Sequence, residues 1–242
     1  MREDKIIEVK NLKKVCREKK ILDIEEFSIF KDKFNFIIGG NGSGKTTLLN
    51  ILSLIDQNYQ GELYYKDQLL KKDEEKLELR RKFSVIWQDP FLYRGDVFYN
   101  IALPLKLRDY SASQIDYLVK DIAVKIEIEN LLEQSAYTLS GGERQKVSIA
   151  RALITEPEIL FVDEATTNLD EESIQFFNSH FADLVTDQMT VVMVSHDRSQ
   201  IKELADYVSL MRQGEIVVSE KRNKFNFNLF GAGIREPIEE IV

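Results

Sequence analysis

The stretch GGNGSGKTT at residues 39–47 decides the fold, because it satisfies the pattern of a phosphate-binding loop. Gly39 and Gly44 frame the loop, and Lys45 and Thr46 follow directly. The near-continuous apolar run FNFII at 34–38 precedes it and favours a strand that is covered on both faces. Apolar residues recur at helical spacing after the loop: Leu48, Leu49, Ile51, Leu52 and Ile55. Strand, glycine loop and helix in this order predict a nucleotide-binding α/β core.

Each part of the loop has a chemical role. Glycines let backbone N–H groups turn inward and approach phosphate oxygens, and the start of the following helix adds partial positive charge. Lys45 would place a full charge on the β and γ phosphates, and the Thr46 hydroxyl would complete a Mg²⁺ shell. The candidate nucleotide-binding residues are therefore Gly39, Gly40, Asn41, Gly42, Ser43, Gly44, Lys45, Thr46 and Thr47.

Two carboxylates follow the apolar run ILFV at 159–162. Asp163 stands at the expected carboxyl end of a buried strand, which is where open α/β sheets bind ligands. It is placed to hold Mg²⁺ directly or through water, and Glu164 to accept a proton from an attacking water. The alternative is that the two acids merely open a loop, and the phosphate-binding loop weighs against it.

The hydrophobic pattern divides the rest of the chain. KIIEVKNL and ILDIEEFSIF alternate with period two, which predicts antiparallel strands with one solvated face. Residues 92–150 read as a helical insertion, in which Ile115, Val119 and Ile122 follow candidate serine caps. Apolar runs at 159–162, 190–194 and 207–211, with a charged helix between the first two, predict parallel pairing.

Composition restricts the function classes. The 242 residues carry a net charge of −8, which argues against a surface built to coat nucleic acid. Cys16 is the single cysteine and cannot form an internal disulfide, so we expect a reduced intracellular thiol. The charged N-terminus does not resemble a signal peptide, and the apolar runs are far shorter than the roughly 20 residues that span a bilayer.

The stretch LSGGERQ at 139–145 is a second glycine-rich loop. Ser140, Gly141 and Gly142 precede a predicted helix, so a hydroxyl, N–H groups and the helix dipole could grip an anion. With the phosphate-binding loop, LSGGERQKVSIARAL and ILFVDEATTNLD in order, the chain resembles the ATP-binding subunits of ABC transporters over residues 5–218.

The resemblance implies further roles. Gln88 in SVIWQDPFLY matches the Q-loop glutamine, which contacts Mg²⁺ and water, and His196 in VVMVSHD matches the switch histidine at the γ-phosphate. Asp170 in TNLD matches the D-loop acid. The implied catalytic set is Glu164, His196, Gln88 and Lys45, and the implied metal set is Thr46, Gln88 and Asp163. In this family the signature loop, here Leu139, Ser140, Gly141, Gly142 and Glu143, completes the site of a second copy in a head-to-tail dimer.

The implied architecture is a single domain over 1–242 with an α/β, P-loop NTPase fold. Residues 1–91 and 151–220 would form the core, with a mixed or parallel sheet and an N-terminal antiparallel β subdomain. Residues 92–150 would form an inserted α-helical subdomain that carries the signature motif, and 221–242 a tail. The tail's Phe225, Phe227 and Phe230 either cover the body's own edge, which we favour, or dock on a partner.

The sequence departs from the family pattern at four positions. Cys16, beside Val15, is the implied nucleotide-binding residue at the position where an aromatic ring usually stacks on adenine, so the preference for ATP over GTP is a matter for experiment. Asp32 replaces a common turn glycine, and aspartate tolerates a left-handed turn better than most residues. Gly40 and Ala165 replace prolines. None of the last three removes a reacting group.

The leading interpretation is an ATP-hydrolysing subunit that drives transport through a separate membrane permease, with ATP and Mg²⁺ as cofactors. The implied location is cytoplasmic, peripheral at the inner face of the cell membrane, and no nucleic-acid partner is expected. The alternative is a soluble non-transport ABC ATPase of the iron–sulfur, translation or repair type; a regulatory nucleotide-binding module is a third reading. The stretches NIALPLKLR at 100–108 and SHDRSQIKELAD at 195–206 are similar to those of tungstate and molybdate importers and of lipoprotein or peptide exporters. The transported substrate and the direction of transport therefore stay open.

Overall fold

The computed structural model describes residues 4–71, 73–166 and 171–230. The chain divides into two compact units, which are considered separately: Met1–Glu75 with Val192–Val242, and Lys76–Val191. Asp170 lies outside the described residues, so the predicted D-loop acid has no structural description.

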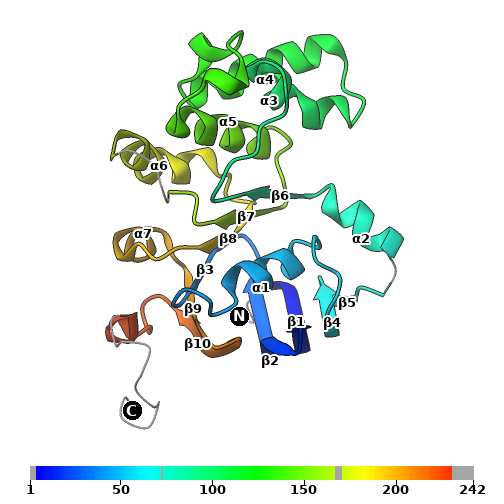
Figure 1. Cartoon of the computed structure of the whole chain (residues 1–242), viewed down its shortest axis with the longest axis vertical. Coiled ribbons are helices and arrows are strands. Elements are labelled where there is room, and N and C mark those ends of the chain that lie inside the picture. Colours follow the sequence, from blue (N-terminus) through cyan, green and yellow to red (C-terminus); the bar gives the residue numbers. More distant parts are fainter. Residues whose placement is uncertain (1–3, 72, 167–170, 231–242) are drawn as a thin grey trace. The chain divides into compact units, whose positions relative to one another are not determined.

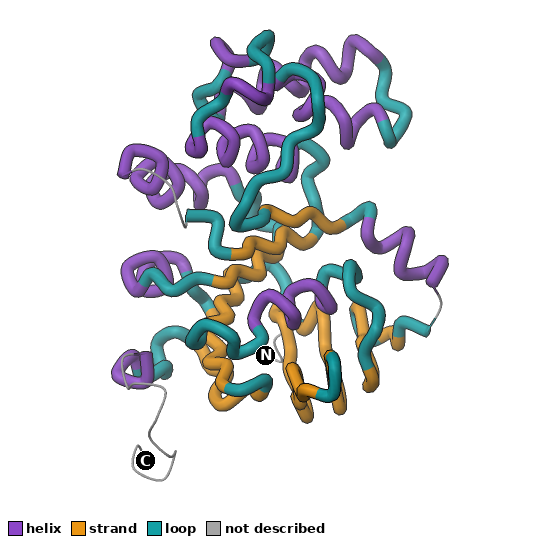
Figure 2. The backbone as a smooth tube through the Cα atoms, viewed as in Figure 1, coloured by secondary structure: helices purple, strands orange, loops and turns teal. Residues whose placement is uncertain are grey.

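The first unit contains a four-stranded antiparallel sheet with the order β2-β1-β4-β5 (Figure 2). Its strands are β1 (Lys5–Cys16), β2 (Lys19–Phe30), β4 (Gln60–Tyr65) and β5 (Gln68–Leu69). Val9 pairs with Phe27 and both are buried, while Lys10 pairs with the exposed Glu26. The period-two prediction of antiparallel strands with one solvated face is therefore confirmed.

The same unit contains the strands around the phosphate-binding loop (Figure 1). They are β3 (Phe34–Ile38), β9 (Tyr207–Arg212), β10 (Glu215–Lys221) and the end of β8 (Thr190–Val194), in the order β10-β9-β3-β8. β3 pairs parallel with β9, and all of β3 except Phe34 is buried, as the apolar run predicts. The helices are α1 (Lys45–Leu52) and α7 (Arg198–Leu204).

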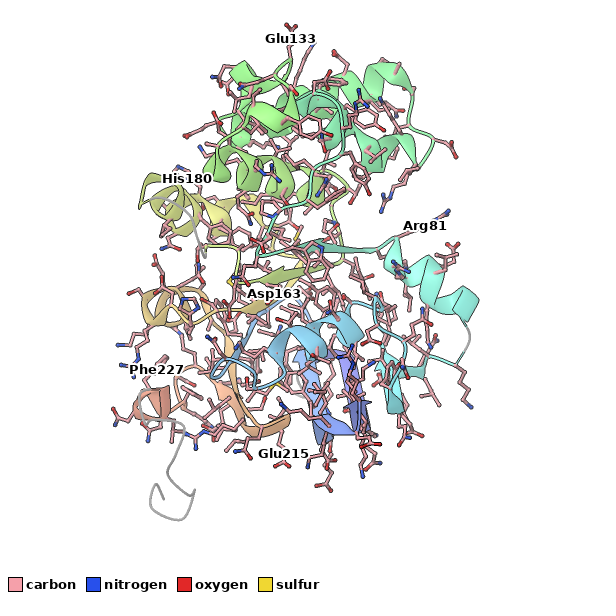
Figure 3. All side chains as sticks on the ribbon, viewed as in Figure 1. Arg81, Glu133, Asp163, His180, Glu215 and Phe227 are labelled. Carbon is pink, nitrogen blue, oxygen red and sulfur yellow. The ribbon has the colours of Figure 1, made fainter. Side chains whose placement is uncertain are left out.

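The described part of the tail, residues 221–230, packs within this unit. Phe225 is 5% exposed, and its ring meets that of Phe227 edge-on with centroids 5.3 Å apart. Phe227, which opens the short helix η3 (Phe227–Phe230), lies under Lys202 of α7, and Arg198 donates to its carbonyl at 2.5 Å (Figure 3). The favoured prediction, that these phenylalanines cover the chain's own body, is confirmed for Phe225 and Phe227; the side chain of Phe230 lies outside the described set.

The second unit pairs β6 (Phe83–Ile86) with β7 (Ile159–Asp163) in parallel. The sequence predicts a strand at 159–162, whereas the strand β6 was not predicted. Its long helices are α3 (Val97–Lys106), α4 (Ala112–Lys125), α5 (Gly141–Leu153) and α6 (Glu171–Leu184). Short elements complete it: α2 (Asp73–Arg80), which begins in the first unit, η1 (Glu129–Leu131) and η2 (Ala136–Thr138). Ser111 caps α4 through a capping box, and Ile115 and Val119 are buried, as their spacing predicts.

Together these elements give the mixed α/β fold that the sequence predicts, with one antiparallel sheet and strands paired in parallel around the phosphate-binding loop. The division of the chain into a core, a helical subdomain over 92–150 and a tail stays a prediction.

Candidate functional site

The phosphate-binding loop connects β3 to α1, and two of its glycines, Gly39 and Gly44, are required by space as well as by conformation. A Cβ on Gly39 (φ 154°) would lie 2.2 Å from the carbonyl oxygen of Met211. A Cβ on Gly44 (φ 104°) would lie 2.7 Å from the Leu22 side chain. At Gly42 nothing lies within 4 Å, so the tip of the loop is open. The loop is packed on its protein side and accessible on the other, as an anion cradle must be.

Two side chains of the loop are poised for an anion. Lys45 is 7% exposed, and its Nζ donates to the carbonyl oxygens of Gly39 at 3.0 Å and Gly40 at 3.1 Å. Ser43 Oγ is buried, and no hydrogen bond to it is recorded among the described residues. A buried hydroxyl that makes no hydrogen bond costs free energy, which a phosphate oxygen would relieve. Thr46 is exposed and Thr47 half-buried in the first turn of α1, and Asn41 is exposed in the loop.

The loop rests on the β9–β10 hairpin, a support that the sequence reasoning missed. The N–H of Gly214 donates to the Ser43 carbonyl at 2.9 Å, and the Gly214 carbonyl accepts from the N–H of Asp23 of β2 at 2.9 Å. Gly214 has a φ of 88°, and a Cβ there would lie 2.3 Å from the Ile21 carbonyl oxygen. The signal available in the sequence was the Gln213-Gly214 pair after an apolar run, which marks a turn but not its contacts.

His196 lies in the first unit, after β8 and before α7. The flanking residues fix its backbone: Asp197 caps α7 by accepting from the N–H of Ser199 at 2.8 Å, and its own N–H donates to Ser195 Oγ at 3.1 Å. The side chain of His196 is exposed, so it is accessible to a ligand. Cys16 is also exposed, at the end of β1 beside the left-handed residue Arg17.

The acidic pair lies in the second unit. Asp163, which is labelled in Figure 3, lies at the end of the fully buried strand β7 and is 4% exposed. Glu164 has a φ of 45° and is half-buried, and Ala165 is 3% exposed. The left-handed conformation of Glu164 turns the chain at the end of the strand.

The signature loop begins α5. Ser140 Oγ accepts from the N–H of Glu143 at 3.3 Å, and Glu143 accepts in return from the N–H of Ser140 at 2.7 Å, which forms a capping box. Leu139 and Gly142 are buried, whereas Ser140 and Gly141 are exposed. A Cβ on Gly141 would meet nothing within 4 Å, so the helix N-terminus is open to a ligand from outside the chain.

Gln88 is half-buried in the loop after β6. Two arginines of α5 bind the backbone that follows it: Arg144 donates to the Pro90 carbonyl at 3.1 Å and Arg151 to the Phe91 carbonyl at 2.7 Å. These two arginines were not among the predicted site residues.

The structure therefore groups the predicted site residues in two sets. The phosphate-binding loop and His196 lie in the first unit; Gln88, Asp163, Glu164 and the signature loop lie in the second. Comparison with known proteins identifies the family: the family model described as "ABC transporter" matches residues 22–167, which include the phosphate-binding loop, Glu164 and the signature loop but not His196.

The chain belongs to the ABC transporter family.

Its relatives in this family are ATP-binding proteins. The chain is 35% identical over 211 residues to the tungstate uptake system ATP-binding protein TupC of Peptoclostridium acidaminophilum, covering 87% of this chain and 96% of that protein. It is 34% identical over 219 residues to the methionine import ATP-binding protein MetN of Francisella tularensis subsp. holarctica (strain OSU18). That match covers 87% of this chain but only 63% of the longer MetN protein.

The fold of the ABC transporter family agrees with a solved structure. The dimeric ATP-binding cassette MJ0796, in a post-hydrolysis state bound to ADP and Pi, matches with a TM-score of 0.81 and 28% identity over 91% of this chain and all of that one. The chain is thus an ATP-binding subunit of the ABC transporter family, and its relatives support transport over the non-transport alternative. Across the described ranges no helix is long and apolar enough to cross a membrane.

Proposed function

We propose that this chain hydrolyses ATP with Mg²⁺ in a head-to-tail dimer, and that hydrolysis drives import through a separate integral membrane permease. The observation that carries the proposal is the phosphate-binding loop, in which Lys45 Nζ is bound to two neutral carbonyls beside the buried Ser43 hydroxyl. Exchanging those carbonyls for γ-phosphate oxygens would give Lys45 stronger, charge-assisted hydrogen bonds.

Hydrolysis needs a group that accepts a proton from water, and Glu164 is the candidate. A carboxylate accepts the proton as the water oxygen attacks the γ-phosphate, and the β–γ bridging bond breaks to release ADP and phosphate. Lys45 and the exposed His196 would stabilise the charge on the transferring phosphoryl group.

Mg²⁺ fits the oxygen donors present. The Thr46 hydroxyl, the Gln88 amide oxygen and the Asp163 carboxylate are hard ligands of the kind that magnesium takes together with water and nucleotide phosphates. Among the described residues, no cluster of three or more histidines, cysteines or acids could hold a metal alone. When bound, Mg²⁺ would neutralise phosphate charge.

The signature loop supports the dimer. Its N-terminal N–H groups and the Ser140 hydroxyl stand at an exposed helix N-terminus, and the Cβ position of Gly141 meets no atom of this chain within 4 Å. An anion carried by a second copy would find an open site there. In the resulting twofold dimer, each nucleotide would lie between the loop at 39–47 of one copy and Leu139–Glu143 of the other.

The permease would bind the exposed aromatics that follow Gln88. Phe91 is 63% exposed, Tyr93 46% and Tyr99 36%, and Phe91 and Tyr93 meet edge-on at 5.2 Å. Exposed aromatics gathered in one place are typical of a protein interface. The named uptake and import relatives support import as the direction. The proposed location, at the inner face of the cell membrane, follows from the proposed binding to the permease.

The Glu164→Gln variant tests the proposal. Glutamine keeps the size of the side chain and removes the proton acceptor, so we expect ATP hydrolysis to fall by about 10²-fold or more while ATP still binds. Lys45→Ala should instead weaken ATP binding itself. Steady-state hydrolysis and equilibrium binding, measured on both variants, separate the two roles. Wild-type turnover by Glu164→Gln would remove Glu164 from the role of base.

A further inference from the structure

Residues 90–93 form a backbone segment that belongs to no helix or strand and is held by side chains. Arg144 Nη2 donates to the Pro90 carbonyl at 3.1 Å, and Arg151 Nη2 donates to the Phe91 carbonyl at 2.7 Å. Both arginines come from α5, and a guanidinium bound to a carbonyl makes a stronger hydrogen bond than a neutral donor does.

The third residue that holds the segment is Asn100 of α3. Its Oδ1 accepts from the N–H of Tyr93 at 2.7 Å, and its Nδ2 donates to the Tyr93 carbonyl at 3.0 Å. Asn100 is fully buried, so both bonds are shielded from water. The guanidinium of Arg151 also lies 5.7 Å from the centroid of the Tyr93 ring, within cation–π distance. The segment is therefore fixed at both of its ends.

The position of Arg151 is costly. Burial removes water from its guanidinium and lowers its pKa, and its Nη1 is buried with no hydrogen bond recorded in the described part of the chain. No carboxylate within the described ranges forms an ion pair with Arg151 or Arg144. The Phe91 carbonyl and the Tyr93 ring are the polar contacts that offset this cost, so Arg151 holds the segment in one specific position.

We infer that Arg151 and Arg144 are positioning residues that fix the segment 90–93 to α5, so that the aromatic surface around Phe91 and the signature loop at the start of α5 move as one piece. This inference rests on the proposed function, which gives Phe91 to the permease and Ser140 and Gly141 to the partner's nucleotide. A displacement of the aromatic surface by the permease then also displaces the signature loop, which completes the second copy's site. ATP bound to the signature loop opposes that displacement, so the two sites are energetically coupled.

The test compares Arg151→Met with Arg94→Met. Methionine keeps most of the apolar length of arginine and removes the donors. Arg94 is the matched control, because it is exposed, next to the segment, and forms no hydrogen bond or ion pair with another described residue. Three readouts are taken on the full chain: hydrogen exchange at the Tyr93 amide, kcat for ATP hydrolysis, and equilibrium binding of ATP.

In Arg151→Met we expect exchange at the Tyr93 amide to rise about tenfold, which is the size of effect that losing a hydrogen bond to a charged group produces. We expect kcat to fall about tenfold and binding of ATP to the first unit's loop to change less than twofold. Arg94→Met should match the wild type in all three. Faster exchange with an unchanged kcat would overturn the inference, because the arginines would then be purely structural; unchanged exchange would overturn it as well.

If Arg151→Met fails to fold, the same measurements on Arg144→Met test the inference instead. That variant removes only the longer hydrogen bond, to the Pro90 carbonyl, at a half-buried site. Its exchange and kcat should change in the same directions by about threefold; wild-type values would overturn the inference. Failure of the proposed function is distinguishable: a wild-type chain that binds ATP but does not hydrolyse it contradicts the function, while the exchange measurement needs no nucleotide.

Discussion

Glu164 has a backbone conformation that a side chain of its size seldom adopts. Its φ of 45° lies in the left-handed region, where a non-glycine residue costs of order 1 kcal/mol or more. Such strain tends to occur at functional sites, where the surrounding structure holds it in place. Asp32 is also left-handed, with φ 54°, as its place in a turn predicts. At Asp32 the left-handed conformation forms a turn, whereas at Glu164 it occurs at the residue that is the candidate proton acceptor.

Gly214 gives the first prediction at the scale of single residues. Gly214→Ala would put a methyl group 2.3 Å from the Ile21 carbonyl at a φ of 88°, and the hairpin must move away from the Ser43 carbonyl. We expect a loss of stability of about 1–3 kcal/mol and weaker ATP binding. Thermal unfolding and ATP titration measure the two effects.

The control for this prediction is Gly141→Ala. Its φ is not left-handed and its added methyl group meets nothing within 4 Å, so its melting temperature should stay near that of the wild type. Equal melting temperatures for Gly214→Ala and Gly141→Ala would contradict the role given to the hairpin.

These residues also show where reading the sequence succeeds. The glycines of 39–47 could be predicted because a short local pattern carries the whole chemical requirement. Gly214 could not, because its requirement comes from β2 and from the phosphate-binding loop, both distant in sequence. Arg151 likewise reads as one more cation on an amphipathic helix until the Phe91 carbonyl is seen beside it.

Helices and strands differ in how far their own sequence determines them. The alternation in β1 and β2 and the serine caps of α4 and α5 are local signals, and the structure follows them. The helix α3 contains Pro104, which normally ends or bends a helix. It persists because Asp96 caps it and Ile101, Ala102 and Leu105 are buried, and that packing depends on neighbouring helices rather than on its own residues.

The tail gives the prediction at the scale of elements. Phe225 is buried, and Phe227 is bound by Arg198 and Lys202 of α7, the helix that follows His196. Phe225→Ala should therefore destabilise the chain by about 3–5 kcal/mol, as is usual for a buried phenylalanine. Asn223→Ala, at an exposed site two residues away, should change stability by less than about 0.5 kcal/mol. Urea unfolding compares them, and equal stabilities would show that the tail is not part of the packed body.

At the scale of the whole molecule, the proposed head-to-tail dimer would give each chain one half of each of two sites. The loop at 39–47 is closed on its protein side by Met211 and Leu22, and it presents Lys45 and Ser43. The signature loop is capped by its own Ser140 and Glu143 and is open at Gly141. Two anion-binding loops in one chain are explained most simply if each serves a different nucleotide, with a second copy related by twofold symmetry.

The most direct test of this account mixes two inactive variants. Lys45→Ala removes the phosphate lysine. Gly141→Asp places a carboxylate at the start of α5, where the helix dipole and the open space favour it but a bound phosphate would be repelled. In a mixed head-to-tail dimer, the intact loop at 39–47 of one variant faces the intact signature loop of the other. If the two sites act independently, an equal mixture should recover about a quarter of wild-type ATP hydrolysis, since half of the dimers are mixed and each has one complete site. A mixture that hydrolyses no more ATP than the separate variants would contradict the head-to-tail site.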